Sequence, residues 1–215
     1  MRPVHEVLLM LVVLTDFWVL GTARLSSMIR ATAIQGALLA MLPLALHREP
    51  SLHMVALALG TLLVKAFVLP RLLVRAIRES SDRREAAPLL GFTMSLALGA
   101  VAVAIAFGIS PGLPIPGVSS DLLVPVALST VMIGLIVLTT RSKAITQVVG
   151  YLVLENGVYI FGLSQVERVP FLVEVGVLLD VFAGVFVMGI VVFHLNRAFD
   201  SLDAGKLTEL KELKD

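Results

Sequence analysis

The sequence predicts an all-α integral membrane protein with about seven transmembrane helices, an outside amino terminus and a cytoplasmic carboxyl terminus. The composition supports this prediction, because 58% of the 215 residues are hydrophobic and only 15% are charged, which is more apolar than a soluble globular domain. The apolar residues also gather in long stretches, most of them near the roughly 20 residues needed to cross the hydrocarbon core of a bilayer. Finally, connections rich in Lys and Arg alternate with connections that contain few of these residues.

The predicted helices follow one another with short polar connections. In chain order the spans are Val4 to Ala23, Ala31 to Leu46, Leu52 to Val74, Pro88 to Ile109, Leu122 to Thr140, Ala144 to Leu163 and Pro170 to Leu195. They divide the chain into a four-helix membrane half (1–109), an external loop rich in proline and glycine (110–121), a three-helix membrane half (122–198) and a polar cytoplasmic tail (199–215). The loop should be stiff, since proline and glycine favour non-helical connections.

The distribution of basic residues predicts the orientation. Every second connection is rich in Lys and Arg, and these connections are Arg24 with Arg30, the loop from Arg71 to Arg84, Arg141 with Lys143, and the carboxyl-terminal tail. Because basic residues are enriched in cytoplasmic loops, these connections should lie inside and the amino terminus outside. Six or eight spans would break the alternation.

Composition excludes several classes of function. The formal net charge is +1 and the basic residues do not form one face, so we expect no nucleic-acid binding. The chain has no cysteine, which removes disulfides, a catalytic thiol and cysteine-ligated iron–sulfur or zinc sites. Motifs of phosphate-binding loops, serine hydrolases and zinc proteases are missing from the sequence. We therefore expect no catalytic site, no cofactor and no metal in this chain.

Ionisable residues near the middle of predicted spans are the candidate functional residues. Lys65, Glu155 and Asp180 lie near the centres of the third, sixth and seventh spans. A charge at the bilayer centre costs about 3 kcal/mol or more, so such residues usually face a bundle interior and serve ion or proton movement. Their equal depth on different helices favours transfer within the membrane plane. Asp16 is a fourth candidate, and Glu174, nearer the outside, is a possible entry or exit group.

Each candidate also has a structural explanation. Lys65 could pair with one of the acids or extend towards the headgroups, whereas Glu155 and Asp180 could be protonated and hydrogen-bonded within the bundle. Thr15 and Trp18 could satisfy Asp16 locally.

Three further polar side chains and one glycine complete the set of candidate residues. Gln35, Gln147 and Asn156 are expected to donate hydrogen bonds between helices, the common role for amides in membrane spans. Gly157 is expected to loosen the helix beside Glu155.

The sequence Glu155-Asn156-Gly157 and the run from Pro170 to Gly184 resemble the hydrogenase-4 component E family of membrane subunits. The last three spans are also similar to the K-type subunit of respiratory complex I and the C-type subunit of multisubunit cation/proton antiporters. Two intramembrane glutamates of the K-type subunit belong to a lateral proton-transfer axis. Asp180 matches the second of these acids, and Glu155 matches the first less closely.

The resemblance implies an accessory membrane-arm subunit of a group 4 hydrogenase or formate hydrogenlyase-like assembly, related to complex I, in a prokaryotic cytoplasmic membrane. Its intramembrane carboxylates would contribute to redox-coupled translocation of protons or sodium. The implied partners are antiporter-like and other membrane subunits, membrane lipids, and a peripheral redox arm that holds the nickel–iron site and iron–sulfur clusters. The alternatives are a stand-alone ion transporter and a purely structural scaffold subunit.

Overall fold

The computed structural model describes residues 4–46, 52–79, 90–113 and 120–165, together with residues 179, 182, 184–187 and 189. Regular secondary structure in these residues is helical, without a β-strand. The elements are α1 (Val4–Leu20), α2 (Leu25–Leu46), α3 (Leu52–Thr61), η1 (Leu62–Val68), α4 (Leu69–Glu79), α5 (Phe92–Ile109), η2 (Ser110–Gly112), α6 (Leu123–Thr140) and α7 (Ala144–Ser164).

Five helical rods in the described chain are long and apolar enough to cross a membrane. They are α2, the continuous rod of α3, η1 and α4, α5 with η2, α6, and α7. The helix α1, with 17 residues, is about as long as α6 at 18 residues, and at 1.5 Å per residue it extends over about 26 Å. The predicted all-α membrane fold is therefore confirmed, and the first six predicted spans correspond to α1 and these five rods.

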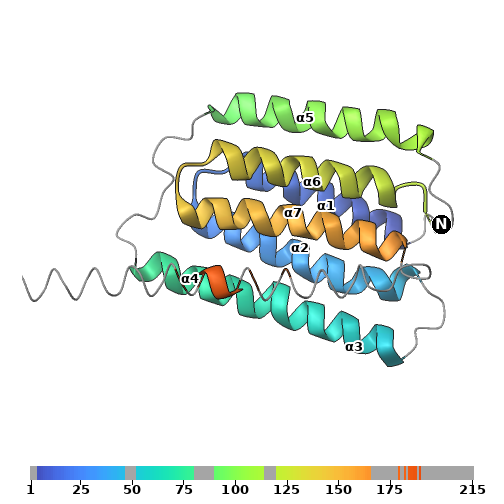
Figure 1. Cartoon of the computed structure of the whole chain (residues 1–215), viewed down its shortest axis with the longest axis horizontal. Helices are drawn as coiled ribbons and strands as arrows, with labels where there is room; N and C mark the ends of the chain where they lie inside the picture. The colour runs from blue at the N-terminus through green and yellow to red at the C-terminus, as the bar shows by residue number, and fades with distance from the viewer. Residues whose placement is uncertain are drawn as a thin grey trace, which may run out of the picture.

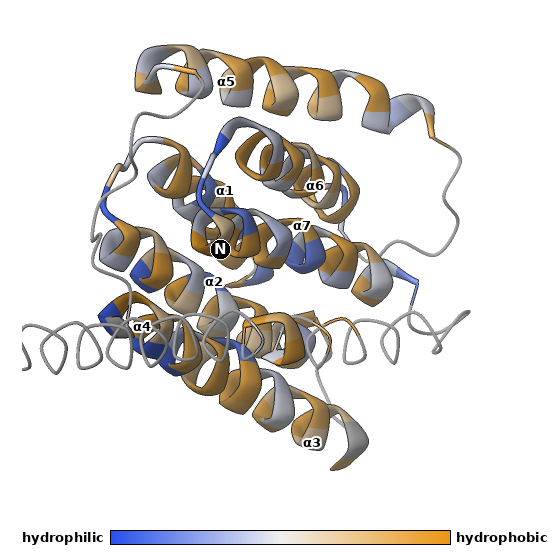
Figure 2. Ribbon diagram, turned by 60° about the vertical axis from the view of Figure 1, so that its left-hand side comes forward, coloured by the Kyte–Doolittle hydropathy of each residue, from blue (hydrophilic) through white to orange (hydrophobic). Residues whose placement is uncertain are grey.

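The helices form a bundle with a well-packed middle and two outer members. Figure 1 shows α5 along one side, the rod of α3 and α4 along the opposite side, and α1, α2, α6 and α7 between them. The hairpin of α6 and α7 packs against α1 and α2, and α2 also contacts α3, η1 and α4. Figure 2 shows hydrophobic residues along the whole length of the helices, while α4 carries a hydrophilic stretch.

Several boundaries differ from the sequence prediction. The second helix begins at Leu25 rather than Ala31, and the third rod continues to Glu79 rather than ending near Val74. Arg30 is exposed on the surface of α2, where a long side chain can extend towards water without interrupting the helix. Residues 110–112 of the predicted non-helical loop form the short 3-10 helix η2. Most of the seventh span, Asp180 and Glu174 included, lies outside the described residues.

The third rod contains a π-helical segment, η1. At its end the backbone N–H of Leu69 donates to the carbonyl of Val64, five residues earlier. Pro70 follows directly, and in a regular α-helix its ring would clash with the carbonyl of Ala66. The wider π turn relieves this clash, and Lys65 lies in the middle of the widened segment. Single π segments inside helices occur frequently at functional sites.

Buried apolar side chains form two clusters at opposite ends of the bundle. By the predicted orientation, the inner cluster includes Val19, Leu25, Met28, Leu73, Val137 and Val149, and the outer cluster includes Leu9, Leu39, Leu123, Tyr159 and Ile160. On each of α1, α2, α6 and α7 the two sets are separated by one short stretch with buried polar residues. These stretches meet at the middle of the bundle.

Candidate functional site

A buried ion pair joins the outer rod that contains η1 to α7 in the middle of the bundle. Lys65 on η1 donates to Glu155 on α7, and the two side chains are 4% and 0% exposed. Lys65 Nζ also donates to Asn156 Oδ1 at 3.0 Å and lies 5.5 Å from the centre of the Tyr159 ring. The Tyr159 hydroxyl in turn shares a 3.3 Å hydrogen bond with Thr61. The ammonium is therefore held by an anion, an amide oxygen and an aromatic face.

A second buried carboxylate lies in the same middle layer of the bundle, on another helix. Asp16 on α1 is fully buried, and its oxygens accept hydrogen bonds from Gln35 Nε2 at 2.7 Å and from Thr130 Oγ1 at 2.8 Å. Gln35 belongs to α2 and Thr130 to α6, so both bonds join different helices. Bonds of this kind hold membrane helices together where apolar contacts alone do not distinguish protein from lipid.

Two amides connect the carboxylate of α1 to the ion pair. Asn156 Nδ2 donates to Gln35 Oε1 at 2.8 Å, so hydrogen bonds run without a gap from Lys65 through Asn156 and Gln35 to Asp16. We call this set the central polar network; its members are Glu155, Lys65, Asn156, Gln35, Asp16 and Thr130. All six side chains are buried, and they come from α1, α2, η1, α6 and α7.

Glycines allow the backbones to approach closely enough for these bonds. A Cβ atom on Gly36, next to Gln35, would lie 2.6 Å from the Cβ of Lys65. A Cβ atom on Gly157, next to Asn156, would lie 2.6 Å from the backbone nitrogen of Val131. Real Cβ atoms do not approach so closely, so these two positions require glycine for the packing that brings the polar side chains into contact.

The charges determine the direction of the hydrogen bonds. An ammonium can only donate and a carboxylate can only accept, so each bond from Lys65 to Asp16 has its donor on the Lys65 side. Asn156 and Gln35 have no proton to exchange, and they maintain distance and polarity between the charged groups. When both carboxylates and the ammonium are ionised, the network has one negative charge in excess, and one added proton neutralises it. The site can therefore hold one exchangeable proton or balance one cation.

The structure brings together three of the five predicted site residues. Lys65 and Glu155 are in direct contact, and Asp16 is joined to them through the two amides. Asp180 and Glu174 lie outside the described residues.

The expected local satisfaction of Asp16 is wrong. Thr15 donates to the carbonyl of Val12 at 2.7 Å and Trp18 donates to Ser27 at 2.9 Å, so neither contacts the carboxylate.

Three further expectations concern neighbouring residues. Gln35 and Asn156 do bond between helices, as predicted, but Gln147 donates to the carbonyl of Arg141 in the adjoining connection. Gly157 does not loosen α7, which is a continuous α-helix. It instead allows α7 to pack closely against α6. The widened helical turn is η1. Sequence reasoning missed Thr130, whose only signal is a hydroxyl near the middle of an apolar span.

The described residues contain no group of three His, Asp or Glu side chains that could hold a metal ion, and the chain has no cysteine. The carboxylates of the central polar network are instead balanced by Lys65 and by neutral hydrogen-bond donors.

Comparisons with known proteins identify relatives of this chain. An uncharacterized protein of Mycobacterium tuberculosis is 37% identical over 206 residues, which cover 93% of this chain and 92% of the relative. Hydrogenase-4 component E of Escherichia coli and that of Shigella flexneri are each 30% identical over 152 residues, which cover 69% of both chains. No family model and no solved structure matches the chain. The length and identity of the match to component E show that the chain belongs to the hydrogenase-4 component E family.

Proposed function

We propose that this chain is an accessory membrane-arm subunit of a group 4 hydrogenase or formate hydrogenlyase-like assembly, in a prokaryotic cytoplasmic membrane. Membership in the component E family supports the assembly. The observation that carries a functional role is the central polar network, in which two buried carboxylates and one buried ammonium are joined across five helical elements. Buried ionisable groups of this kind are typical of ion and proton pathways in membranes.

In the proposed mechanism, redox events in partner subunits change the protonation of Glu155 and Asp16. Lys65 contacts Glu155 directly and reaches Asp16 through the two amides. A proton gained or lost by one carboxylate therefore changes the electrostatic energy of the other, since interactions between charges are strong in low-dielectric surroundings. Asp180 and Glu174 remain proposed continuations of the path towards neighbouring subunits.

The nickel–iron site and the iron–sulfur clusters are proposed for the partner subunits. Iron–sulfur clusters are held mainly by cysteine thiolates, and this chain has none. The expected partners are antiporter-like membrane subunits and a peripheral redox arm.

The test uses isosteric variants of the whole chain in its native complex. In Asp16→Asn the new amide can accept from Gln35 and donate to Thr130, and in Glu155→Gln the carbonyl oxygen can still accept from Lys65. We expect both variants to assemble and to keep electron transfer, but to move fewer protons or sodium ions per electron in inside-out vesicles. Asp121→Asn, at an exposed carboxylate before α6, is the matched control and should behave as wild type.

One observation favours a scaffold role as the second candidate, namely that every member of the central polar network is bonded to another member on a different helix. A scaffold predicts that Asp16→Asn and Glu155→Gln either reduce assembly or change nothing. An unaltered ion-to-electron ratio in both assembled variants would reject the relay. Ion flux in liposomes containing the purified chain alone would instead indicate a stand-alone transporter.

A further inference from the structure

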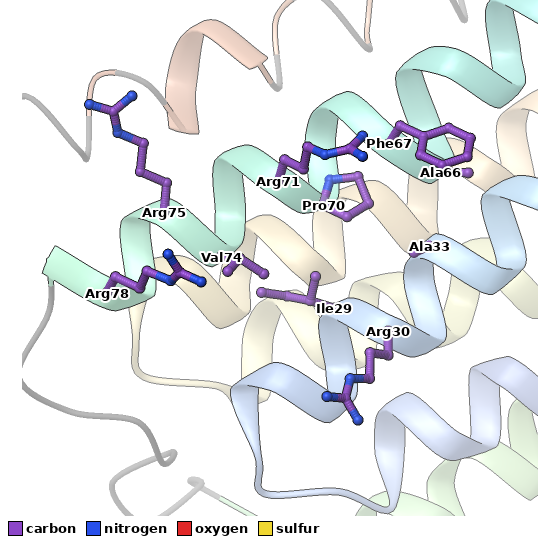
Figure 3. Close-up of a pocket in the computed structure, with 10 residues that line it drawn as sticks. All are labelled: Ile29, Arg30, Ala33, Ala66, Phe67, Pro70, Arg71, Val74, Arg75 and Arg78. Carbon is purple, nitrogen blue, oxygen red and sulfur yellow. The ribbon is translucent and has the colours of Figure 1, made fainter.

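A pocket of about 610 Å³ opens at the surface between α2 and the rod of η1 and α4. Figure 3 shows the arginines of α4 along one side of it and Arg30 of α2 on the other. Its lining consists of Ile29, Arg30, Ala33, Ala66, Phe67, Pro70, Arg71, Val74, Arg75 and Arg78. The pocket is separate from the central polar network, none of whose members lines it.

Four of the ten lining residues are arginines and, among the described residues that line the pocket, none is acidic. Arg71, Arg75 and Arg78 are spaced four and three residues apart, which places them on one face of α4. All four guanidinium-bearing residues are exposed. Such a cluster attracts a phosphate group, for which the planar donors of arginine are well suited.

At its other end the pocket is lined by apolar residues. Ala66, Phe67 and Pro70 lie towards the middle of the rod, while Arg75 and Arg78 lie towards its end. The Arg71 guanidinium lies 5.2 Å from the centre of the Phe67 ring, at the border between the two regions. By the predicted orientation the cationic end is at the cytoplasmic surface and the apolar end extends into the membrane. A ligand that fits this arrangement has an anionic head and an apolar tail.

We propose that this pocket binds the phosphodiester headgroup of an anionic phospholipid, with an acyl chain along Phe67 and Pro70. Basic pockets between transmembrane helices at the cytoplasmic side are a known mode of recognition for anionic lipids. The membrane is the source of such a ligand at this depth, whereas free phosphate would use the arginines and leave the apolar half uncovered. This inference does not depend on the function proposed for the central polar network.

The pocket also adjoins that network through the backbone. Ala66 lines the pocket and Lys65, the preceding residue of the same π turn, bonds to Glu155 in the bundle interior. A bound lipid would therefore contact the element that positions Lys65, and we expect occupancy to stabilise the full chain against heat.

The experiment measures lipid binding to the purified full chain in a neutral detergent, by native mass spectrometry and by thermal unfolding. The probes are phosphatidylglycerol, phosphatidylcholine with the same acyl chains, and inorganic phosphate. We expect phosphatidylglycerol to bind most tightly and to raise the unfolding temperature. The double variant Arg71→Gln/Arg78→Gln should weaken its binding by at least about tenfold, as expected for the loss of two basic contacts.

Two further variants make the result specific. Arg24→Gln/Lys143→Gln removes two cations at the same predicted surface but outside the pocket, and it should leave binding unchanged. Val74→Trp fills the pocket from an exposed position without altering charge, and it should weaken binding. Equal binding of both lipids, equal effects of the two double variants, or full displacement of phosphatidylglycerol by millimolar phosphate would each overturn the proposal.

Discussion

Lys65 is the residue on which the central polar network depends. Its side chain is 4% exposed, and its ammonium is bonded to Glu155 and Asn156. A buried charge is stable only when it is paired and hydrogen-bonded, and removing one partner of such a pair leaves the other uncompensated. The stability of the bundle and the chemistry of the site therefore rest on the same contacts.

We expect Lys65→Met to destabilise the chain by about 3–5 kcal/mol, because it leaves the Glu155 carboxylate buried without its cation. The double variant Lys65→Met/Glu155→Gln should be more stable than Lys65→Met alone, since it removes the uncompensated charge as well. Thermal unfolding in detergent measures both. A double variant no more stable than the single one would show that the pair does not carry this energy.

A pair between Lys65 and one of the mid-span acids could be anticipated from sequence, because opposite charges buried in a bilayer pair with each other. The partners of Asp16 could not. Depth along a helix can be counted in residues, but the direction in which a side chain faces depends on how each helix is rotated in the bundle. Thr15 and Trp18 are near Asp16 in sequence, yet the residues that bond to it are Gln35, 19 residues away, and Thr130, 114 residues away.

At the scale of the elements, the hairpin of α6 and α7 has the closest packing. Gly157 lies against the backbone of Val131, and Gly150 lies against that of Leu138. In a bilayer, helices associate through close contact and polar bonds, because lipid is as apolar as the helix surface. Small residues at these positions therefore contribute directly to the stability of the hairpin.

Gly157→Ala should destabilise the chain by about 1–3 kcal/mol, because the added methyl group forces α6 away from α7. Gly108→Ala on α5 is the matched control, since a Cβ there meets nothing within 4 Å, and it should be neutral or stabilising by up to about 1 kcal/mol. The unfolding temperatures of the two variants, each compared with that of the wild type, measure the two effects. Equal effects would mean that helix propensity, rather than the close approach, determines the outcome.

Arg141 lies in a connection whose bounds the sequence predicts correctly, but the sequence does not predict its burial. The predicted loop cation is in fact 1% exposed, donates to the carbonyl of Leu20 at 2.9 Å at the end of α1, and lies 5.1 Å from the ring centre of Phe92 at the start of α5. A cation at a helix carboxyl terminus satisfies the last carbonyls and complements the helix dipole. A charge count identifies the side of the membrane for such a residue but not its burial.

At the scale of the whole molecule, the bundle is layered along its length. The inner and outer apolar clusters enclose the central polar network, so the polar groups are shielded from both surfaces. The helical nature of the fold and its five long apolar rods could be predicted because apolar length alone indicates them. The layering could not be predicted from the sequence, since it depends on which helices are neighbours.

The predicted orientation can be measured directly, because the chain has no native cysteine. Arg78 on α4 and Asp121 before α6 are both exposed and lie towards the inner and outer ends of the bundle. A membrane-impermeant maleimide should label Asp121→Cys in intact cells and Arg78→Cys only in inside-out vesicles. The reverse pattern would contradict the positive-inside prediction, and labelling of both from one side would contradict the fold.

The π segment η1 also restricts how the length of this protein can change. An α-helix turns by about 100° per residue, so insertion of one residue between Lys65 and Arg71, beyond the extra residue that the π turn already accommodates, would rotate all of α4 relative to the network by that angle. Leu73 and Ala76, now buried, would turn towards lipid, and the arginines would leave their pocket. We therefore expect natural variants of this stretch to exchange residues freely at exposed positions such as Val68 while gaining none.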